Sequence, residues 1–165
     1  MAELAFALML AIDRRVPDNV VDLRAGTWNK KEYSKARGLQ GSTLGLLGAG
    51  SIAAEMVKRA AGFGMPVVVW SRRFDGQDRL LTDRELSTFG AADAGRSSRV
   101  RVAPTPTAVA AASDVLSIHL ALTPETRLLV DRSVVGALKP GAMLLNTARA
   151  EVLDYDAVAE AVRAR

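Results

Sequence analysis

A glycine-rich turn between an apolar run and an amphipathic stretch constrains the fold of this chain more than any other feature. Residues 44–47 read Leu-Gly-Leu-Leu, and residues 48–53 continue as Gly-Ala-Gly-Ser-Ile-Ala. Apolar residues then recur with helical spacing from Ile52 to Phe63. This order predicts a buried strand, a tight turn and a helix whose first N–H groups face an anion.

The sequence predicts a structural role for each small residue of the glycine turn. Gly48 allows the tight turn, and Gly50 lets the backbone approach the pyrophosphate of a dinucleotide. Ala53 stands at the third small position, where helix and strand pack closely. We expect Ser51 and Ile52, at the helix start, to present their backbone N–H groups to the phosphates. Strand–glycine–helix turns also occur in α/β proteins that bind no nucleotide, so this segment alone leaves both interpretations open.

Composition excludes several kinds of chemistry. The 165 residues, 49% apolar and 24% charged, suit one globular domain. The chain has no cysteine, which excludes disulfides, thiolate catalysis and cysteine-ligated metals. His119 is the single histidine, so we expect no metal site. The absence of cysteine also fits a cytoplasmic location.

Neither nucleic acid nor a membrane is an expected partner. The net charge is +4, but the basic residues are spread along the chain and only 5% of residues are aromatic, too few for a stacking platform. Residues 4–12 are apolar but much shorter than the roughly 20 residues that span a bilayer. Glu3 stands where a signal peptide would carry positive charge, so this run is interpreted as a buried helix.

The rest of the chain alternates between strand and helix patterns. An N-terminal helix is expected over residues 2–22, closed near Gly26, followed by a connecting arm over 27–40 anchored by Trp28 and Tyr33. The expected strands are 43–48, 67–70, 100–102, 115–120 and 142–146. The expected helices are 51–64, 105–113, 131–138 and 155–163. Residues 74–99 lack periodicity and are expected to form a long excursion with one helical turn at 83–86. Such alternation implies an α/β fold with right-handed crossovers and a parallel sheet.

Three further segments make the interpretation specific. Residues 113–126 read SDVLSIHLALTPET, residues 138–149 read LKPGAMLLNTAR, and AELA at 2–5 precedes RAGTW at 24–28. With the glycine turn, in this order, they resemble the NAD(P)-dependent D-isomer-specific 2-hydroxyacid dehydrogenases over nearly the whole chain. The resemblance implies a Rossmann-type, doubly wound parallel sheet. Residues 1–40 would be a hinge and dimerisation helix with its arm, and 41–165 an NAD(P)-binding domain, incomplete at its C-terminus and without most of the substrate domain.

The resemblance also implies an activity, namely hydride transfer between a nicotinamide cofactor and a 2-oxo or D-2-hydroxy acid of the phosphoglycerate, hydroxypyruvate or glyoxylate type. It assigns Arg149 the catalytic role, because a guanidinium fork holds both a carboxylate and an adjacent carbonyl. The alternative is a surface arginine paired with Glu151. The family's catalytic glutamate and histidine lie beyond this segment, and His119 ends an earlier strand. We therefore expect the chain alone to be nearly inactive, and the alternative function is a non-catalytic nucleotide-binding or dimer-forming module.

Cofactor choice depends on the end of the second strand. An acidic residue about 20 positions after the glycine turn usually binds the adenosine ribose, but here Ser71 matches that position and Arg72 and Arg73 follow. A hydroxyl and two guanidiniums favour a 2′-phosphate, so NADP or both cofactors are expected. The alternative is that the arginines are solvated and NAD is merely tolerated. The resemblance adds further cofactor-binding positions: Leu120, Ala121, Thr126, Thr147, Ala148 and Arg149 itself.

The N-terminal helix is apolar on nearly every side, with Leu4, Phe6, Leu8, Met9, Leu10 and Ile12 in its length. Packing on one face would leave an exposed apolar patch. In the resembling family this segment belongs to a subunit contact, so a homodimer is expected. The alternative is a helix docked wholly within its own domain.

Overall fold

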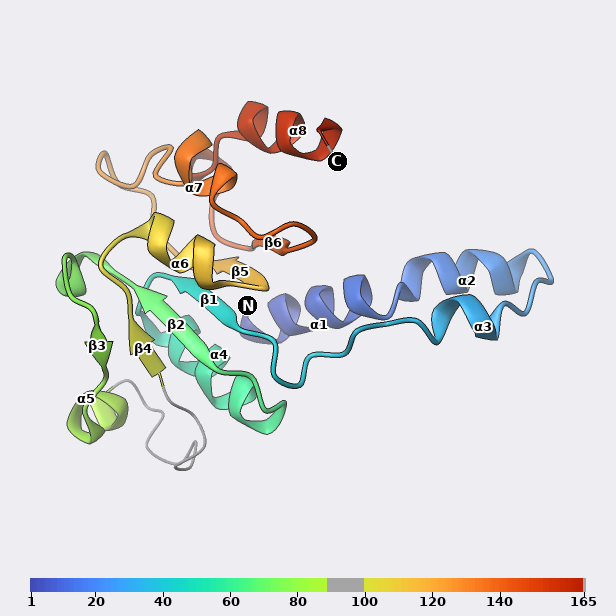
Figure 1. Ribbon diagram of the computed structural model, residues 1–165, viewed down its shortest axis with the longest axis horizontal. Coiled ribbons are helices and arrows are strands. Elements are labelled where there is room, and N and C mark those ends of the chain that lie inside the picture. The colour runs from blue at the N-terminus through green and yellow to red at the C-terminus, as the bar shows by residue number, and fades with distance from the viewer. Residues whose placement is uncertain (89–99, 165) are drawn as a thin grey trace.

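A six-stranded sheet in the order β3-β4-β2-β1-β5-β6 forms the centre of the molecule (Figure 1). The computed structural model describes residues 1–88 and 100–164. Five strands run parallel: β1 (Leu44–Leu47), β2 (Val67–Trp70), β4 (Val100–Val102), β5 (Val115–Ile118) and β6 (Met143–Asn146). The predicted strands and the doubly wound order are confirmed. The two-residue edge strand β3 (Arg79–Leu80) is antiparallel to β4 and was not expected, because it lies in a stretch without periodicity.

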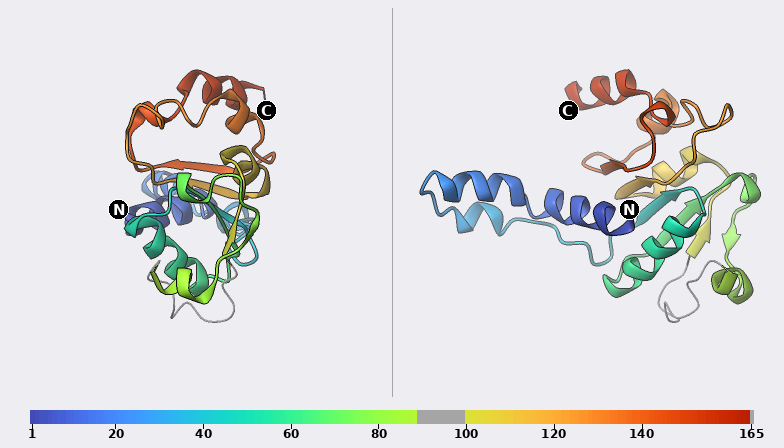
Figure 2. Two further views of the ribbon diagram at one scale, coloured as in Figure 1. Left: turned by 90° about the vertical axis from the view of Figure 1, so that its left-hand side faces the viewer. Right: turned by 180° about the vertical axis from the view of Figure 1, so that it is seen from behind.

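Helices cover both faces of the sheet (Figure 2). α1 (Ala2–Asp13) and α4 (Ser51–Gly62) contribute their buried residues to the core on one face. The core on the other face contains residues of three helices: α6 (Pro106–Ala112), α7 (Arg132–Gly136) and α8 (Tyr155–Arg163). Every residue of β1, β2 and β5 is buried, as expected for strands covered on both sides.

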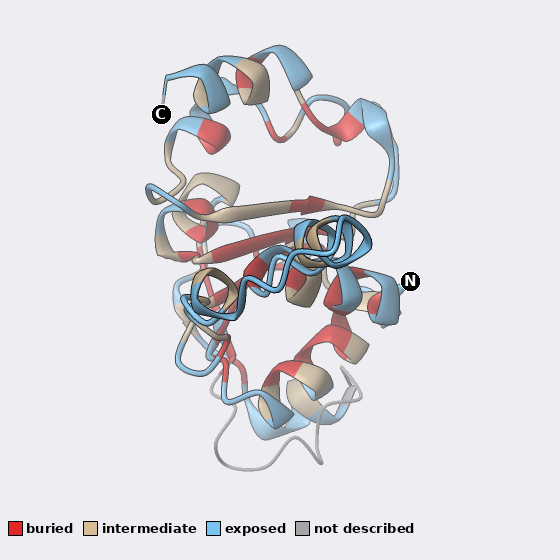
Figure 3. Ribbon diagram, turned by 90° about the vertical axis from the view of Figure 1, so that its right-hand side faces the viewer, coloured by how far each residue is buried: buried red, intermediate tan, exposed pale blue. Residues whose placement is uncertain are grey.

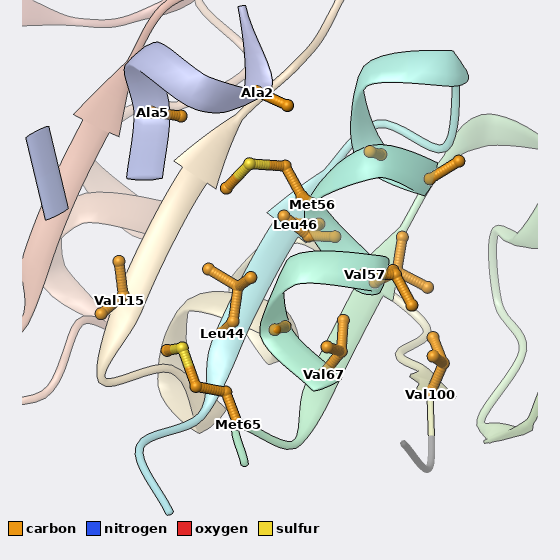
Figure 4. Packing of buried hydrophobic residues seen from close by; sticks show 14 of the residues in the cluster. Ala2, Ala5, Leu44, Leu46, Met56, Val57, Met65, Val67, Val100 and Val115 are labelled. Carbon is orange, nitrogen blue, oxygen red and sulfur yellow. The ribbon is translucent and has the colours of Figure 1, made fainter. Parts of the chain in front are cut away.

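Alternation along β1 supplies both cores. Leu44 and Leu46 pack with the α4 side chains shown in Figure 4, and Leu47 belongs to the opposite cluster. Gly45 also faces that second side, where a Cβ would meet the side chain of Ser113 and come within 2.9 Å of Val109 Cγ1. Glycine at this position therefore lets α6 lie close to the strand.

The helix expected over residues 2–22 is broken into α1 and α2 (Val16–Arg24), so the prediction of one continuous helix is wrong. Arg15 adopts a left-handed conformation with φ of 51°. The cause is Pro17 in the first turn of α2, because a proline ring inside a continuous helix clashes with the carbonyl four residues earlier. Gly26, with φ of 78°, follows the end of α2 as predicted.

α2 and α3 (Lys30–Tyr33) form an arm that projects from the sheet (Figures 1 and 2). The Tyr33 hydroxyl donates to Asp22 at 2.6 Å, and Arg15 donates to Glu32 at 2.9 Å, so both contacts join the two halves of the arm. Trp28 is 75% exposed, so its predicted anchoring role is wrong. Figure 3 shows the strands largely buried and the arm largely exposed.

The segment after β2 contains η1 (Arg72–Phe74) and α5 (Asp83–Thr88), which confirms the helical turn expected at 83–86. The remainder of the expected excursion, residues 89–99, lies outside the described residues. A second short 3-10 turn, η3 (Ala150–Val152), follows β6. None of the helices in the described ranges is long and apolar enough to cross a lipid bilayer.

Asp114 joins the amino ends of three adjacent strands. Its Oδ2 accepts from the Thr43 N–H at 2.8 Å, and its Oδ1 accepts from the Lys139 ammonium at 3.1 Å. Its carbonyl accepts from the Met143 N–H at 3.0 Å, at the start of β6. Partial burial alone would raise the pKa of Asp114, but the Thr43 N–H and the Lys139 ammonium outweigh it and lower that pKa. The carboxylate thus stays charged, and the carboxylate and carbonyl of Asp114 together link β1, β5 and β6 at this edge.

Candidate functional site

The carboxyl ends of β1, β5 and β6 open onto one cleft of about 460 Å³. Ligands of doubly wound sheets bind at this edge. The cleft is lined by residues from four separate parts of the chain: Met1, Gly50, Ser51, Ile52, His119, Leu120, Ala121, Leu122, Thr147, Ala148 and Arg149. Most of the predicted cofactor-binding residues are therefore brought together.

The glycine turn forms one wall of this cleft. Gly48 has φ of +108°, and a Cβ there would lie 2.9 Å from the carbonyl carbon of His119. Gly50 precedes α4, and the space into which its Cβ would project is open, with no atom within 4 Å. No side chain in the described part of the chain caps α4, and the N–H groups of Ser51 and Ile52 have no acceptor within the helix. An open approach and unsatisfied donors fit a bound pyrophosphate.

Arg149 stands at the opposite wall, after β6. Its guanidinium is exposed and donates one hydrogen bond, from Nη1 to the Ala148 carbonyl at 3.0 Å. Within the described part of the chain it forms no ion pair, and the alternative pairing with Glu151 is absent there. The fork is therefore available to an anionic ligand at the mouth of the cleft.

Asn146 fixes the loop that carries Arg149, a role that sequence reasoning missed. Its Oδ1 accepts from the Ala148 N–H at 3.0 Å, and its Nδ2 donates to the Arg149 carbonyl at 2.9 Å. The only signal in the sequence was an amide residue at the end of a strand, directly before the predicted site. The neighbouring Thr147 hydroxyl is buried and has no hydrogen-bond partner among the described residues.

His119 lies in the cleft at the end of β5. The imidazole Nε2 is 2.9 Å from the Ser117 hydroxyl. Burial, helped by the nearby N-terminal ammonium group, lowers the pKa of His119 to about 4. The imidazole is therefore neutral at physiological pH, and a protonated form that would donate to a substrate is scarce.

Thr126 lies outside the cleft and shapes the loop that lines it. Its hydroxyl donates to the Ala121 carbonyl at 2.6 Å and accepts from the Thr123 N–H at 2.8 Å. The residue is only 3% exposed. Its hydroxyl is thus used within the loop, where it fixes Ala121 at the cleft wall next to Leu120.

The residues after β2 lie beside the glycine turn but outside the cleft. The guanidinium of Arg73 donates to the Ala49 carbonyl at 3.4 Å and stacks 4.5 Å from the Phe74 ring centre. Arg72 Nη1 lies 3.5 Å from a carboxylate oxygen of Glu125. The Ser71 hydroxyl is buried without a hydrogen-bond partner in the described ranges, so it must turn outward to meet a ligand. Among the described residues, no cluster of histidine and carboxylate side chains is placed to hold a metal ion.

Comparison with known proteins decides the family. Residues 6–165 match the family described as D-isomer specific 2-hydroxyacid dehydrogenase, NAD binding domain. The chain belongs to this family. NAD(P) is accordingly the cofactor of this nucleotide-binding domain, and the glycine turn beside the cleft is the expected feature of such a domain.

The relatives of this NAD-binding domain are considerably longer proteins. The present chain is 32% identical to the glyoxylate reductase of Thermococcus litoralis and 33% identical to the hydroxypyruvate reductase of Thermotoga maritima. In both comparisons the alignment covers 98% of this chain and 46% of the relative. The solved NAD-dependent formate dehydrogenase of Staphylococcus aureus in complex with NAD has a TM-score of 0.76 at 26% identity, covering 99% of this chain and 44% of that one. The chain thus spans about half the length of these proteins.

Proposed function

We propose that the chain is the cofactor-binding part of an oxidoreductase that transfers a hydride between a nicotinamide cofactor and a 2-oxo or D-2-hydroxy acid. One observation supports this proposal most directly. A single cleft joins the uncapped start of α4 to Arg149, two features from distant parts of the sequence. The first suits a pyrophosphate and the second suits a carboxylate with an adjacent carbonyl.

The cofactor's nicotinamide ring, when bound, supplies the hydride acceptor or donor. In this proposal Gly48 and Gly50 give the pyrophosphate access to the N–H groups of Ser51 and Ile52. Loop residues 120–121 form the wall beside the dinucleotide, and residues 147–148 form the wall on the nicotinamide side. Residues 50–52, 120–121 and 147–148 all line the cleft, whereas Gly48 contributes only to the conformation of the turn.

Arg149 is the substrate-holding group in this proposal. Its guanidinium binds the substrate carboxylate and stabilises negative charge that grows on the carbonyl oxygen during hydride transfer. Asn146 keeps the loop in place, because both of its side-chain hydrogen bonds go to the backbone of the loop. A 2-oxo or 2-hydroxy acid fits the planar fork, and the two relatives named above are reductases of such acids by name.

We further propose that NADP is accepted at least as well as NAD. None of the three residues after β2, Ser71, Arg72 and Arg73, carries a carboxylate that would repel a 2′-phosphate. The Arg73 guanidinium contacts the Ala49 carbonyl in the glycine turn, and the Arg72 guanidinium contacts Glu125 in the loop after β5. A phosphate gains charge-assisted hydrogen bonds from such groups.

A homodimer is the proposed assembly. α1 buries Phe6 and Met9 in its own domain but leaves Leu4, Leu8 and Ile12 exposed at 48%, 39% and 48%. The spacing of four residues places these three on one face of the helix. α2 continues the apolar exposure, and its projection beyond the sheet makes that surface accessible to a second copy.

The cleft itself favours a second candidate function for the chain taken alone. The described residues that line it include no carboxylate, and His119 is largely neutral, so none of these residues is an efficient proton donor at the substrate position. A non-catalytic nucleotide-binding or dimer-forming module would have the same cleft. The two functions differ in whether the longer protein reduces a 2-oxo acid.

Titration of the chain with NADH and NADPH, followed by nicotinamide fluorescence, tests the shared binding step. Gly50→Val fills the open space beside the turn and is expected to abolish binding while the fold is retained. Gly62→Ala, at the far end of α4 with open space around it, is the matched control and should bind normally. Absence of cofactor binding by the unaltered chain, or full binding by Gly50→Val, would contradict the proposal.

A further inference from the structure

Arg72 and Glu125 meet across the end of the central strand. β1 lies between β2 and β5 in the sheet, and the glycine turn follows β1. Arg72 comes after β2, whereas Glu125 belongs to the loop after β5. Their contact, 3.5 Å from Nη1 to Oε2, therefore spans the carboxyl edge of β1 from one neighbouring strand to the other.

Two neighbouring contacts place this ion pair close to the glycine turn. Arg73 donates to the Ala49 carbonyl at 3.4 Å, which holds η1 against the turn itself. On the other side, Thr126 binds the carbonyl of Ala121, and this keeps the loop that carries Glu125 against the cleft wall. An adenosine that extends from the turn toward the end of β2 must pass the same place.

The pair is exposed and weak enough to open. The two side chains are 63% and 62% exposed, and ion pairs at such positions contribute little because water and salt screen them. The pKa of the Glu125 carboxyl is lowered mainly by its hydrogen bonds with Thr123 and its own backbone, and further by Arg72, so the carboxylate is charged at neutral pH. A 2′-phosphate carries about −2 charges and competes for the same guanidinium.

We propose that Glu125 is a specificity-determining residue that competes with the 2′-phosphate of NADP for Arg72 and so limits the preference for NADP over NAD. This inference rests on the proposed role of Arg72 in NADP binding. Arg72 must break its ion pair with Glu125 before it binds the phosphate, and the Glu125 carboxylate then remains close enough to repel the phosphate. NAD has no 2′-phosphate, so its binding does not need the guanidinium.

Neutralising the carboxylate gives the test. Dissociation constants of NADPH and NADH are measured by fluorescence for the unaltered chain, Glu125→Gln, Arg72→Gln and the double variant. We expect Glu125→Gln to tighten NADPH by about two- to fivefold, the range set by exposed ion pairs, and to leave NADH unchanged. The gain should vanish in the Arg72→Gln background. Asp78→Asn, which removes the exposed partner of Arg101 elsewhere on the sheet, is the matched control.

Each result has one meaning. Unchanged NADPH affinity in Glu125→Gln, together with a loss in Arg72→Gln, overturns the competition and leaves the NADP proposal intact. Weaker NADH binding in Glu125→Gln also overturns it, because the carboxylate would then accept from the ribose hydroxyls. Unchanged NADPH affinity in Arg72→Gln refutes the proposed role of Arg72 and this inference with it. A gain from Glu125→Gln that persists in the Arg72→Gln background overturns the inference alone.

Discussion

The side-chain amide of Asn146 binds the backbone around Arg149 on two sides, accepting from the Ala148 N–H at 3.0 Å and donating to the Arg149 carbonyl at 2.9 Å. The residue that ends β6 thereby fixes the conformation of the next three residues. The proposed substrate-holding arginine depends on a neighbour that does not itself line the cleft.

Asn146→Ala should loosen this loop and lower the free energy of unfolding by about 1–2 kcal/mol, because two hydrogen bonds are lost. Hydrogen exchange should become faster at the Ala148 amide. Asn146→Asp is the control, since it keeps the acceptor for Ala148 and removes only the donor to Arg149. Protection of Ala148 should therefore persist in Asn146→Asp, and equal exchange in all three chains would contradict the role of the amide.

Cofactor preference should follow Arg72. The unaltered chain is expected to bind NADPH at least as tightly as NADH, and Arg72→Asp should weaken NADPH by about 10- to 100-fold through loss of a charge-assisted hydrogen bond and added repulsion. NADH affinity should change little. Calorimetric titration of both cofactors measures this difference. A clear preference of the unaltered chain for NADH that the substitution does not alter would show that the arginines are only solvated charges.

Dehydrogenase turnover by the chain alone should be very low. Among the described residues that line the cleft, none is an acid placed to donate a proton, which typically forfeits about 10²–10⁴-fold in rate. The chain also spans only about half the length of its relatives, so groups that orient the substrate in those longer proteins can be missing from it. Absorbance at the nicotinamide band, with glyoxylate and hydroxypyruvate as substrates, measures the rate. Rapid reduction of either acid would mean that the catalytic groups have been assigned incorrectly.

Dimerisation should depend on the outward face of α1. Leu4→Glu with Leu8→Glu places two charges on the proposed interface and should convert a dimer into a folded monomer at micromolar concentration. Sedimentation velocity detects the change, and circular dichroism confirms the fold. Val162→Glu, on the exposed side of α8, is the control and should remain dimeric. An unaltered chain that sediments strictly as a monomer would refute the assembly.

His119 should titrate far below an ordinary histidine. Its pKa is lowered to about 4 in the folded chain, against about 6.5 in the unfolded chain. The unfolded state therefore takes up a proton first, and this residue reduces stability as the pH falls from about 6.5 toward 4. Because the chain has one histidine, a single imidazole resonance in NMR reports the value directly. A midpoint near 6.5 would contradict the burial argument.

Sequence patterns predicted the sheet well, because each central strand is an apolar run covered on both faces and each crossover helix has clear boundaries. They did not predict which side of α1 is buried. That helix is apolar all round, so periodicity does not distinguish Phe6, which packs 5.5 Å from the Phe63 ring, from Leu8, which faces outward. The break before Pro17 was visible in the sequence, but the apolar pattern on both sides of it favoured one helix.

The candidate site could be predicted only in part. The glycine turn and Arg149 follow from local motifs, and the structure places both at one cleft. The contact between Arg72 and Glu125 joins residues that are distant in the sequence, so no local pattern indicates it. The function of the Thr126 hydroxyl within its own loop likewise depends on an irregular backbone that has no sequence period.

Asp114, through its carboxylate and its backbone carbonyl, links β1, β5 and β6 at the edge of the sheet away from the cleft. The register of the strands that carry the cleft loops is therefore stabilised at the opposite edge of the sheet, by contacts that do not involve those loops. Their residues can diverge without letting one strand slide past the next. We therefore expect substitutions of the charged side chains around the cleft, such as Arg72 and Glu125, to change cofactor preference without disturbing the register of the sheet.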